Sequence, residues 1–525
     1  MMRLQRGGMK RRFAINQALG LLAVSGLHIA RAFSSTHAAL SLEIPNQAAG
    51  IYLHIPFCRR RCYYCDFPIK VVGEKASTHR SSGEYYTDLL IKDIERWTAR
   101  TQEKGRLVDT IYFGGGTPSL LPDQCIEQVL DKLRQTFRVD SSAEVTLEMD
   151  PGTFDYDRLL RLRDYGVNRI SMGVQSFDNA MLQHCGRPHS VEDARSALEA
   201  LHRADWDNFS IDLISSLPHL TPQLWEDTLL QASNCGSSHI SVYDLQLEPG
   251  TAFSRWYSPN SHPLPTETIS ADMYRTAVRV LGNANFEHYE VSNYALPGRR
   301  SRHNQKYWQC APVLAFGMSA ASYLQGQRFV RPRDMRKYEE YVEDLASWPI
   351  TETSPHKPER LINPTIAEVS ETSKPSMTTA VKSGDSEHIP DMLDFLMLSL
   401  RTADGLDMTV FTARYGERNA AKVLGALGPY IHQGLVLLLD NHSAGTENNV
   451  NIVNNANNVN SLNGVNGVMS VNSKGSVNNN VNSEMSVNGC AGITRVRLSD
   501  PDGLMISNDI ISSVFAVLPN NEAEE

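Results

Sequence analysis

The stretch Cys58-Arg-Arg-Arg-Cys62-Tyr-Tyr-Cys65-Asp-Phe67 places three cysteines within eight residues, in a C-x3-C-x2-C spacing. A structural zinc site usually closes with four nitrogen or sulfur ligands, and iron–sulfur clusters are also usually held by four cysteines. Three adjacent thiolates therefore favour a [4Fe–4S] cluster with one iron left open to an exchangeable ligand. Zinc would need a distant fourth ligand, and the remaining cysteines show no second paired spacing: Cys125, Cys185, Cys235, Cys310 and Cys490.

Apolar, β-rich runs alternate with amphipathic segments from Gly50 onwards. We expect strands at residues 51–55, 110–113, 144–148, 169–174, 209–214 and 240–245, and helices at residues 85–98, 122–137, 155–165, 191–204 and 223–235. Six strands with helices between them predict an α/β fold with a parallel, partly closed (β/α)6 barrel. The first strand runs directly into the cysteine loop, which would place the loop at the C-terminal end of the barrel. The alternation alone would equally permit a doubly wound sheet.

The loop ending Cys62-Tyr-Tyr-Cys65-Asp66-Phe67 resembles that of the radical S-adenosylmethionine (SAM) superfamily. Within it, the chain is similar to the group that contains the oxygen-independent coproporphyrinogen dehydrogenase HemN and the heme chaperone HemW. HemN has another cysteine two places after the third ligand, where this chain has Phe67, and this departure favours HemW. The resemblance implies a [4Fe–4S] cluster on Cys58, Cys62 and Cys65, with SAM as the second cofactor.

The resemblance also implies where SAM binds. The glycine run Gly114-Gly-Gly116-Thr117-Pro118 follows an expected strand and resembles the family's site for the methionyl amino group of SAM. Polar residues also stand at or near the ends of later expected strands, where a barrel active site forms. By the same resemblance, the SAM-contacting positions fall on Tyr52, Tyr64, Gly116, Thr117, Glu148, Gln175, Arg187 and Asp212.

The run His303-Asn304-Gln-Lys-Tyr307-Trp308 resembles the motif that marks HemW proteins and is associated with heme binding. Imidazole is a common axial ligand of heme iron, and aromatic rings offer flat apolar faces to a porphyrin. We therefore expect His303 to be the heme ligand, with Asn304, Tyr307 and Trp308 around it. Cys310, two residues past Trp308, is the alternative ligand.

Composition and charge limit the partners. The chain has 525 residues, a net charge of −9 and no run of about 20 apolar residues, so we expect neither a nucleic-acid surface nor an integral membrane span. Its eight cysteines, three of them clustered, favour thiolate chemistry in a reducing compartment over a disulfide framework.

The first 48 residues are expected to be an organellar targeting presequence, because they carry six basic residues and no acid before Glu43. Arg31-Ala-Phe-Ser34 resembles a mitochondrial processing site, and we place the protein in the mitochondrion. Ala30-Arg-Ala32 after an apolar stretch resembles a signal-peptidase site, which would suit a plastid reached through a bipartite signal. The cytoplasm is the third alternative.

The barrel domain is expected to span residues 49–345, with the heme motif at 303–308. Residues 352–389 are rich in Ser, Thr, Pro and charge and predict a disordered insertion. Residues 390–440 and 491–518 resemble the small, mainly helical, winged-helix-like domain that closes HemN and HemW chains. Residues 496–498 and 504–507 are expected to return there as one strand. Between these pieces, residues 441–490 form an asparagine-rich low-complexity insertion.

Three functions are compatible with these features. A HemW-like heme chaperone would bind the cluster, SAM and heme, deliver heme to acceptor hemoproteins and need an electron donor for its cluster. The alternatives are an oxygen-independent coproporphyrinogen III dehydrogenase of porphyrin biosynthesis and a radical SAM enzyme of unrelated substrate. Phe67 and the complete motif from His303 to Trp308 favour the chaperone. No catalytic residue is assigned, and the sequence leaves open whether SAM is cleaved to a radical.

Overall fold

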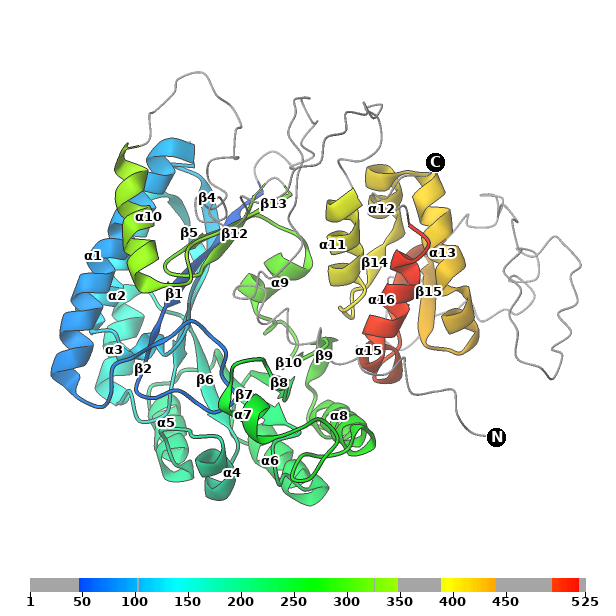
Figure 1. Cartoon of the computed structure of the whole chain (residues 1–525), viewed down its shortest axis with the longest axis horizontal. Helices are drawn as coiled ribbons and strands as arrows, with labels where there is room; N and C mark the ends of the chain where they lie inside the picture. The colour runs from blue at the N-terminus through cyan, green and yellow to red at the C-terminus, as the bar shows by residue number, and fades with distance from the viewer. Residues whose placement is uncertain (1–46, 102, 325, 348–388, 441–492, 519–525) are drawn as a thin grey trace, which may run out of the picture. The chain divides into compact units, whose positions relative to one another are not determined.

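The computed structural model describes residues 47–101, 103–324, 326–347, 389–440 and 493–518 (Figure 1). These residues fall into two compact units, one on each side of residue 381. The expected presequence and the two expected insertions lie outside the described residues, apart from residues 47, 48 and 389.

The larger unit is built on one eleven-stranded sheet with the order β13-β12-β11-β1-β4-β5-β6-β7-β8-β10-β9. The strands from β11 to β8 in this order pair in parallel, and the outer strands on both sides are antiparallel. The bounds are β1 Ala49–Ile55, β4 Leu107–Gly115, β5 Arg138–Met149, β6 Arg169–Gln175, β7 Phe209–Ser215, β8 His239–Asp244, β9 Glu287–Glu290, β10 Asn293–Ala295, β11 Val313–Phe316, β12 Ala321–Leu324 and β13 Gln327–Val330.

All six strands predicted from the sequence are confirmed, as β1 and β4 to β8. They stand side by side in chain order, whereas a doubly wound sheet reverses its strand order at a switch point, so the doubly wound alternative is wrong. Within the described residues, the edge strands β13 and β9 do not pair with each other, and the barrel is therefore open.

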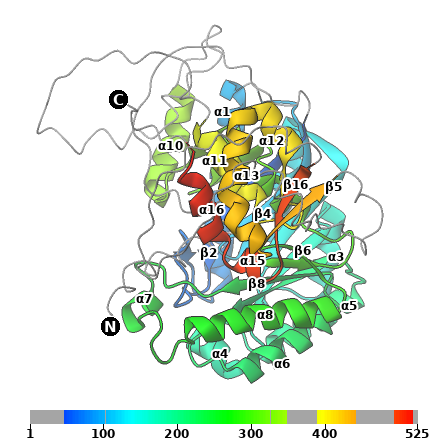
Figure 2. The same ribbon diagram turned by 90° about the vertical axis from the view of Figure 1, so that its right-hand side faces the viewer.

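The five predicted helices are also present, as α1 Ala76–Thr101, α2 Asp123–Thr136, α3 Tyr156–Tyr165, α5 Val191–Arg203 and α6 Pro222–Ser233. Their ends follow local chemistry: Ser190 and Asp193 form a capping box on α5, and Gly166 ends α3 in a left-handed conformation. Five further helices were not predicted from the sequence: α4 Asn179–His184, α7 Ala252–Trp256, α8 Glu267–Asn283, α9 Arg302–Trp308 and α10 Met335–Ser347. Helix α8 packs beside α6 (Figure 2).

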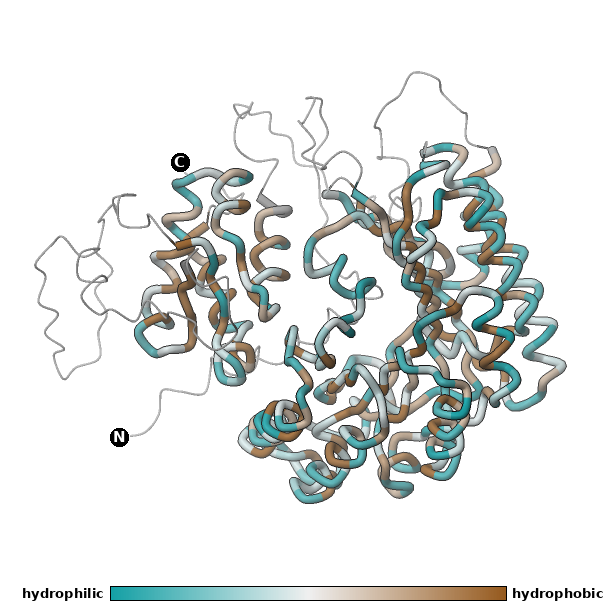
Figure 3. Tube along the Cα trace, turned by 180° about the vertical axis from the view of Figure 1, so that it is seen from behind, coloured by the Kyte–Doolittle hydropathy of each residue, from teal (hydrophilic) through white to brown (hydrophobic). Residues whose placement is uncertain are grey.

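The strand pleat divides each strand between an apolar and a polar face. On β1, Ile51 and Leu53 are fully buried in the core under the helices, while Tyr52 and His54 point to the barrel interior. On β5, Leu147 belongs to the same core and Glu148 lines the interior pocket. Hydrophobic residues accordingly alternate with polar residues along the chain of the larger unit, whose trace is coloured by hydropathy in Figure 3.

A buried ion pair fastens the late strands to α1. The carboxylate of Asp93 accepts hydrogen bonds from Arg331 Nε at 2.7 Å, the Tyr338 hydroxyl at 2.9 Å and the Gly317 N–H at 3.1 Å. Asp93 is 0% exposed and Arg331 3% exposed. Because a buried charge is costly without a partner, this network ties the end of β13 and helix α10 to the barrel.

The smaller unit is mainly helical, as expected. It contains α11 Ile389–Ser399, α12 Met408–Tyr415, α13 Glu417–His432, α15 Asp502–Met505 and α16 Ser507–Phe515, with a three-stranded antiparallel sheet of β14 Leu406–Asp407, β16 Ile493–Leu498 and β15 Val436–Asp440. The expectation that residues 504–507 extend a strand is wrong. Strand β16 ends at Leu498, and Pro501, which lacks an N–H for a sheet, starts the helical turn α15.

None of the helices in the described segments has both the length and the apolar character needed to cross a membrane.

Candidate functional site

The cysteine loop starts where β1 ends. Strand β2 Phe57–Cys58 pairs with β3 Lys70–Val71 on the far side of the loop. The glycine run at the end of β4 is hydrogen-bonded to the start of the loop. Gly116 N–H donates to the Ile55 carbonyl oxygen at 2.9 Å, and Thr117 N–H donates to the Phe57 carbonyl oxygen at 2.6 Å. A Cβ at Gly116 would lie 2.6 Å from the Phe57 carbonyl oxygen and 3.0 Å from Cys58 Sγ. Glycine is therefore required for the close approach of the two loops.

Arg61 fixes the second half of the loop. Its guanidinium donates to the carbonyl oxygens of Cys65 at 3.2 Å, Phe67 at 2.9 Å and Ile69 at 3.4 Å. Cys65 N–H donates in turn to the Cys62 carbonyl at 3.2 Å. These contacts hold the backbone that presents Cys62 and Cys65.

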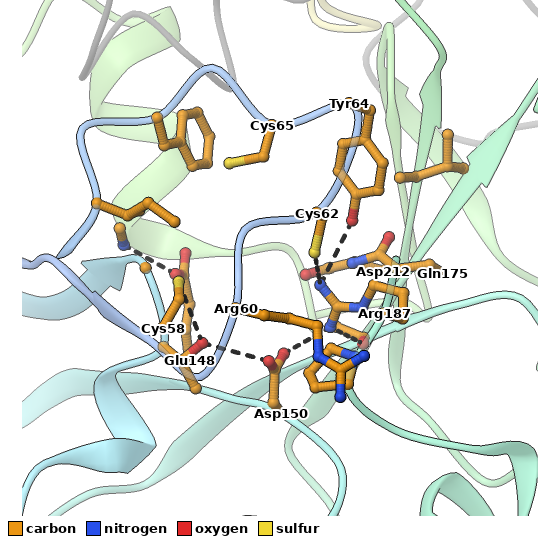
Figure 4. Close-up of a pocket in the computed structure, with 18 of the residues that line it drawn as sticks. Cys58, Arg60, Cys62, Tyr64, Cys65, Glu148, Asp150, Gln175, Arg187 and Asp212 are labelled. Atoms are coloured by element: carbon orange, nitrogen blue, oxygen red, sulfur yellow. Dashed lines mark hydrogen bonds and ion pairs between the residues drawn. The ribbon is translucent and has the colours of Figure 1, made fainter. Parts of the chain in front are cut away.

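One pocket gathers all but one of the residues expected to hold the cluster and SAM. It encloses about 1330 Å³ of empty space, part of it open to solvent, at the C-terminal ends of the parallel strands. Figure 4 shows the cysteine loop on one side and the strand-end residues facing it. The lining includes the expected residues Cys58, Cys62, Cys65, Tyr64, Gly116, Thr117, Glu148, Gln175, Arg187 and Asp212.

Glu148 and Asp212 are two of the carboxylates that line this pocket. Glu148 accepts from the Tyr112 hydroxyl at 2.8 Å and from the Gly115 N–H at 3.0 Å, and burial raises its pKa to about 7. Asp212 accepts from the Ser171 hydroxyl at 3.3 Å, and burial raises its pKa to about 6. Both groups lie where a cationic ligand would favour their ionised forms.

Arg187 and Asp150 form an ion pair that joins the cysteine loop to the strands. Arg187 donates to Asp150 at 2.7 Å, to the Tyr64 hydroxyl at 3.4 Å and to Cys62 Sγ at 3.5 Å (Figure 4). Asp150 also accepts from the Thr117 hydroxyl at 3.2 Å. Sequence reasoning missed Asp150, although it stands directly after β5, the same kind of position that identified the other strand-end residues.

The pocket fits the two cofactors that the sequence implied. Gln175 Oε1 and Arg187 Nε are buried there without a hydrogen-bond partner in the described structure, so an acceptor and a donor are left for a ligand. Gln175 also has a φ of 67°, a strained conformation for a residue with a side chain and one often found at functional sites. With two carboxylates beside these groups, a cation that carries amino and hydroxyl donors, such as SAM, suits the site.

The three loop cysteines have the placement that a shared cluster needs, because Cys58, Cys62 and Cys65 all line the same pocket. Cys125, Cys185, Cys235 and Cys310 do not line the pocket, and Cys490 lies outside the described residues. Burial, and then the neighbouring Cys62, raises the pKa of Cys65 to about 12, so a metal must displace its proton on binding.

Tyr52 does not line the pocket, unlike the other residues expected to contact SAM. It is 6% exposed and lies deeper in the barrel, where its ring stacks on Tyr112 with centroids 6.1 Å apart. Its hydroxyl lies 3.2 Å from His54 Nδ1, and His54 Nε2 donates to the Pro68 carbonyl at 3.1 Å. Tyr52 therefore supports the segment that follows the cysteine loop rather than facing the pocket.

His303 lies at the opposite end of the barrel. Its ring is 1% exposed, and both nitrogens have partners: Nδ1 is 2.9 Å from the Thr110 hydroxyl and Nε2 is 3.1 Å from the Tyr307 hydroxyl. The His303 N–H donates to Glu144 at 3.0 Å. Burial lowers the pKa of His303 to about 3, so the imidazole is neutral. A neutral imidazole is the form that ligates metals, but neither nitrogen is free in this conformation.

The neighbours of His303 are also packed rather than open. Trp308 is 8% exposed, so its faces are not available for stacking as the sequence reading expected. Asn304 and Tyr307 are half-buried, and the Asn304 N–H donates to Ser301 Oγ at the start of α9. Cys310, half-buried, follows α9 with a φ of 51°. A porphyrin iron would reach a His303 nitrogen only after the present partner of that nitrogen moved away.

Three comparisons place the chain among known proteins. Residues 52–232 match the Radical SAM superfamily. The chain is 43% identical over 297 residues to a Synechocystis protein named heme chaperone HemW, a match that covers 57% of this chain and 70% of that protein. It is 36% identical over 278 residues to bovine radical S-adenosyl methionine domain-containing protein 1, mitochondrial, covering 52% of this chain and 60% of that protein.

Among solved structures, the Escherichia coli coproporphyrinogen III oxidase HemN aligns with 91% of this chain and 92% of its own chain, with a TM-score of 0.63 and 20% identity. At this identity the likeness establishes a common fold and nothing more.

The first test concerns the cluster ligands. Cys58→Ala, Cys62→Ala and Cys65→Ala should each abolish iron–sulfur absorption, because each removes one of only three protein ligands. Cys235→Ala, outside the pocket, is the control and should keep a full cluster. Iron and sulfide analysis of anaerobically purified protein measures the result, and a full cluster in all three loop variants would contradict the assignment.

The second test concerns the pocket carboxylates. Glu148→Gln and Asp212→Asn should each weaken SAM binding by about 1–3 kcal/mol, because ligand donors lose a charged acceptor. In the wild type, SAM affinity should fall as the pH drops below about 7, since protonation then removes the negative charge of Glu148. Calorimetric titration of cluster-loaded protein measures both effects. Unchanged affinity in both variants would place SAM elsewhere.

Proposed function

Because the chain belongs to the HemW family of the radical SAM superfamily, we propose that it is a heme chaperone, which binds heme and delivers it to hemoproteins. The observation that carries this proposal is the 43% identity to a protein named heme chaperone HemW, over 70% of that protein's length. Acceptor hemoproteins and an electron donor for the cluster are then its partners.

We assign the [4Fe–4S] cluster to Cys58, Cys62 and Cys65 and SAM to the adjoining pocket. The shared pocket supports this assignment, since the thiols, the two carboxylates and the partnerless Gln175 oxygen line one space. The Arg187–Asp150 pair links both halves of that space. SAM bound there supplies radical chemistry when the cluster reduces it, and whether this protein uses that chemistry is separate from heme delivery.

The coproporphyrinogen dehydrogenase reading is the less favoured alternative. The likeness to HemN is one of fold, and at the place where HemN has an additional cysteine this chain puts Phe67 on the pocket wall. An apolar ring there offers no further thiolate to a ligand or a substrate.

We place heme at the α9 motif, with His303 as its axial ligand. The motif's position supports a site separate from the SAM pocket, because His303 touches Thr110 near the start of β4 whereas the pocket lies at the strand ends. Because only one imidazole nitrogen binds the iron, ligation through Nε2 requires the imidazole to leave Tyr307, while Nδ1 can keep its contact with Thr110. The cost is the loss of one buried hydrogen bond, about 0.5–1.5 kcal/mol, which an iron–imidazole bond offsets.

We place the protein in the mitochondrion, on the likeness to mitochondrial relatives such as the bovine protein. The plastid stays the alternative, and the higher identity to a cyanobacterial protein supports keeping it. A fluorescent protein fused behind residues 1–48 should enter mitochondria, and its accumulation in plastids or the cytoplasm would overturn this location.

His303→Ala should reduce heme retention or shift the Soret band of the full chain, because it removes the proposed ligand. Thr110→Val is the matched control, since it deletes the hydrogen bond to the same imidazole but leaves the ligand in place. The control should keep heme binding while losing a similar amount of stability. Anaerobic heme titration and thermal unfolding of both variants measure these effects.

Two results would count against the proposal. Equal heme affinity in wild type and His303→Ala would remove the heme ligand from the α9 motif. Robust SAM-dependent decarboxylation of coproporphyrinogen III by the wild-type protein would restore the dehydrogenase alternative despite Phe67.

A further inference from the structure

Two chains of contacting side chains connect the SAM pocket to α9 through the barrel interior. The pocket lies at the C-terminal ends of the parallel strands, and α9 lies against their beginnings, where Gly50 and Thr110 face the His303 ring. A Cβ at Gly50 would lie 2.9 Å from Lys306 Cδ and 3.2 Å from His303 Cε1, so α9 packs directly on β1. The space between the two ends is filled by interior side chains of the strands.

Tyr112 makes the first crossing. Its hydroxyl donates to Glu148 at 2.8 Å, and its ring stacks on the His303 imidazole with centroids 5.1 Å apart and planes 28° from parallel. The Tyr307 ring also packs edge-on against the imidazole, with ring centroids 5.3 Å apart. One side chain therefore touches both a pocket carboxylate and the proposed heme ligand.

The second crossing starts at Asp212. The Ser210 hydroxyl lies 3.5 Å from Asp212 and 2.7 Å from His239 Nδ1, and His239 Nε2 lies 2.7 Å from the Tyr289 hydroxyl. The Tyr289 hydroxyl is also hydrogen-bonded to a backbone group of Ser301, the residue that caps α9. Glu148 and Asp212 are thus both connected by buried contacts to the helix that carries the heme motif.

We propose that SAM is an allosteric effector of this protein, and that Tyr112 is the positioning residue through which SAM in the pocket holds α9 and His303 in their packed arrangement. This inference rests on the proposed function only for its consequence, which is that SAM lowers the affinity of the α9 motif for heme. The α9 helix is the element with two arrangements, packed against the barrel or released to a ligand.

The direction of the coupling follows from charge. SAM carries a sulfonium and an ammonium group, so its binding favours the ionised form of Glu148. A carboxylate accepts a stronger hydrogen bond than a neutral carboxyl group, which tightens the contact from Tyr112. A fixed Tyr112 ring in turn supports the imidazole between itself, Thr110 and Tyr307. SAM therefore favours the arrangement in which both nitrogens of His303 are occupied, and heme must compete with it.

Hydrogen–deuterium exchange of the cluster-loaded full chain, with and without SAM, tests the coupling without heme. SAM should slow exchange of the α9 amides about fivefold or more in the wild type, and Tyr112→Phe should lose this effect while keeping the ring stack. Tyr86→Phe is the control, because it also removes a buried tyrosine hydroxyl, here bonded to the His54 carbonyl, and Tyr86 neither lines the SAM pocket nor, in the described structure, makes a ring contact with His303. This control should keep the full response.

A second measurement titrates heme at zero and saturating SAM. The heme dissociation constant of the wild type should rise by about the same factor, and heme should raise the SAM dissociation constant equally, since coupling is reciprocal. If Tyr112→Phe does not fold, Glu148→Gln at saturating SAM replaces it and should show a reduced response, because Tyr112 then donates to a neutral acceptor.

No response of α9 in the wild type with bound SAM, or a full response in Tyr112→Phe, would overturn the coupling. Suppose that SAM slows exchange of the α9 amides as expected, but that His303→Ala leaves the heme affinity unchanged. This result would uphold the coupling and refute the assignment of His303 as the heme ligand. The two proposals therefore fail by different results.

Discussion

The organisation of the larger unit follows from the pleat of its parallel strands. The pleat points alternate side chains to opposite faces of the sheet. Helix-facing residues such as Leu53 and Phe113 are fully buried in an apolar core. Interior residues are aligned by strand register, in which Gly50 pairs with Thr110 and Tyr52 with Tyr112. Successive layers of the interior therefore hold, in order, the contacts of His303, the stacked tyrosines and the pocket carboxylates.

A polar interior of this kind is costly unless its groups are paired. Most of the cost is offset within the barrel, since Glu144 accepts the first N–H groups of α9 and Tyr112 supports Glu148. Some of the buried polar atoms left without a partner in the described structure belong to residues that line the pocket, and there Gln175 combines a partnerless oxygen with a strained backbone. At a pocket, a ligand is a simple explanation for the retention of such a group.

The sequence predicted the strands because each is a short β-rich run in which apolar residues recur, and it predicted most of the pocket because strand ends converge. It was less informative about position along a strand. Tyr52, at the middle of β1, was expected to contact SAM and lies outside the pocket lining, and Tyr112 was missed because an inward tyrosine looks like ordinary core. The motif identified His303, but only the fold shows its buried, doubly hydrogen-bonded state. Short helices such as α9 were not predicted because they have too few residues to show a periodic pattern.

The placement of the motif also bears on the choice between chaperone and dehydrogenase. A substrate attacked by a SAM-derived radical must lie in the pocket beside the cluster loop, at the C-terminal ends of the strands. His303 lies at the other end of the same strands, with Tyr112 and its neighbours between. In the packed arrangement of α9, Tyr112 therefore separates His303 from such a substrate. If heme binds at the α9 motif, as proposed, it occupies a second site, and that arrangement suits heme binding under the control of a cofactor better than conversion of a porphyrin in the pocket.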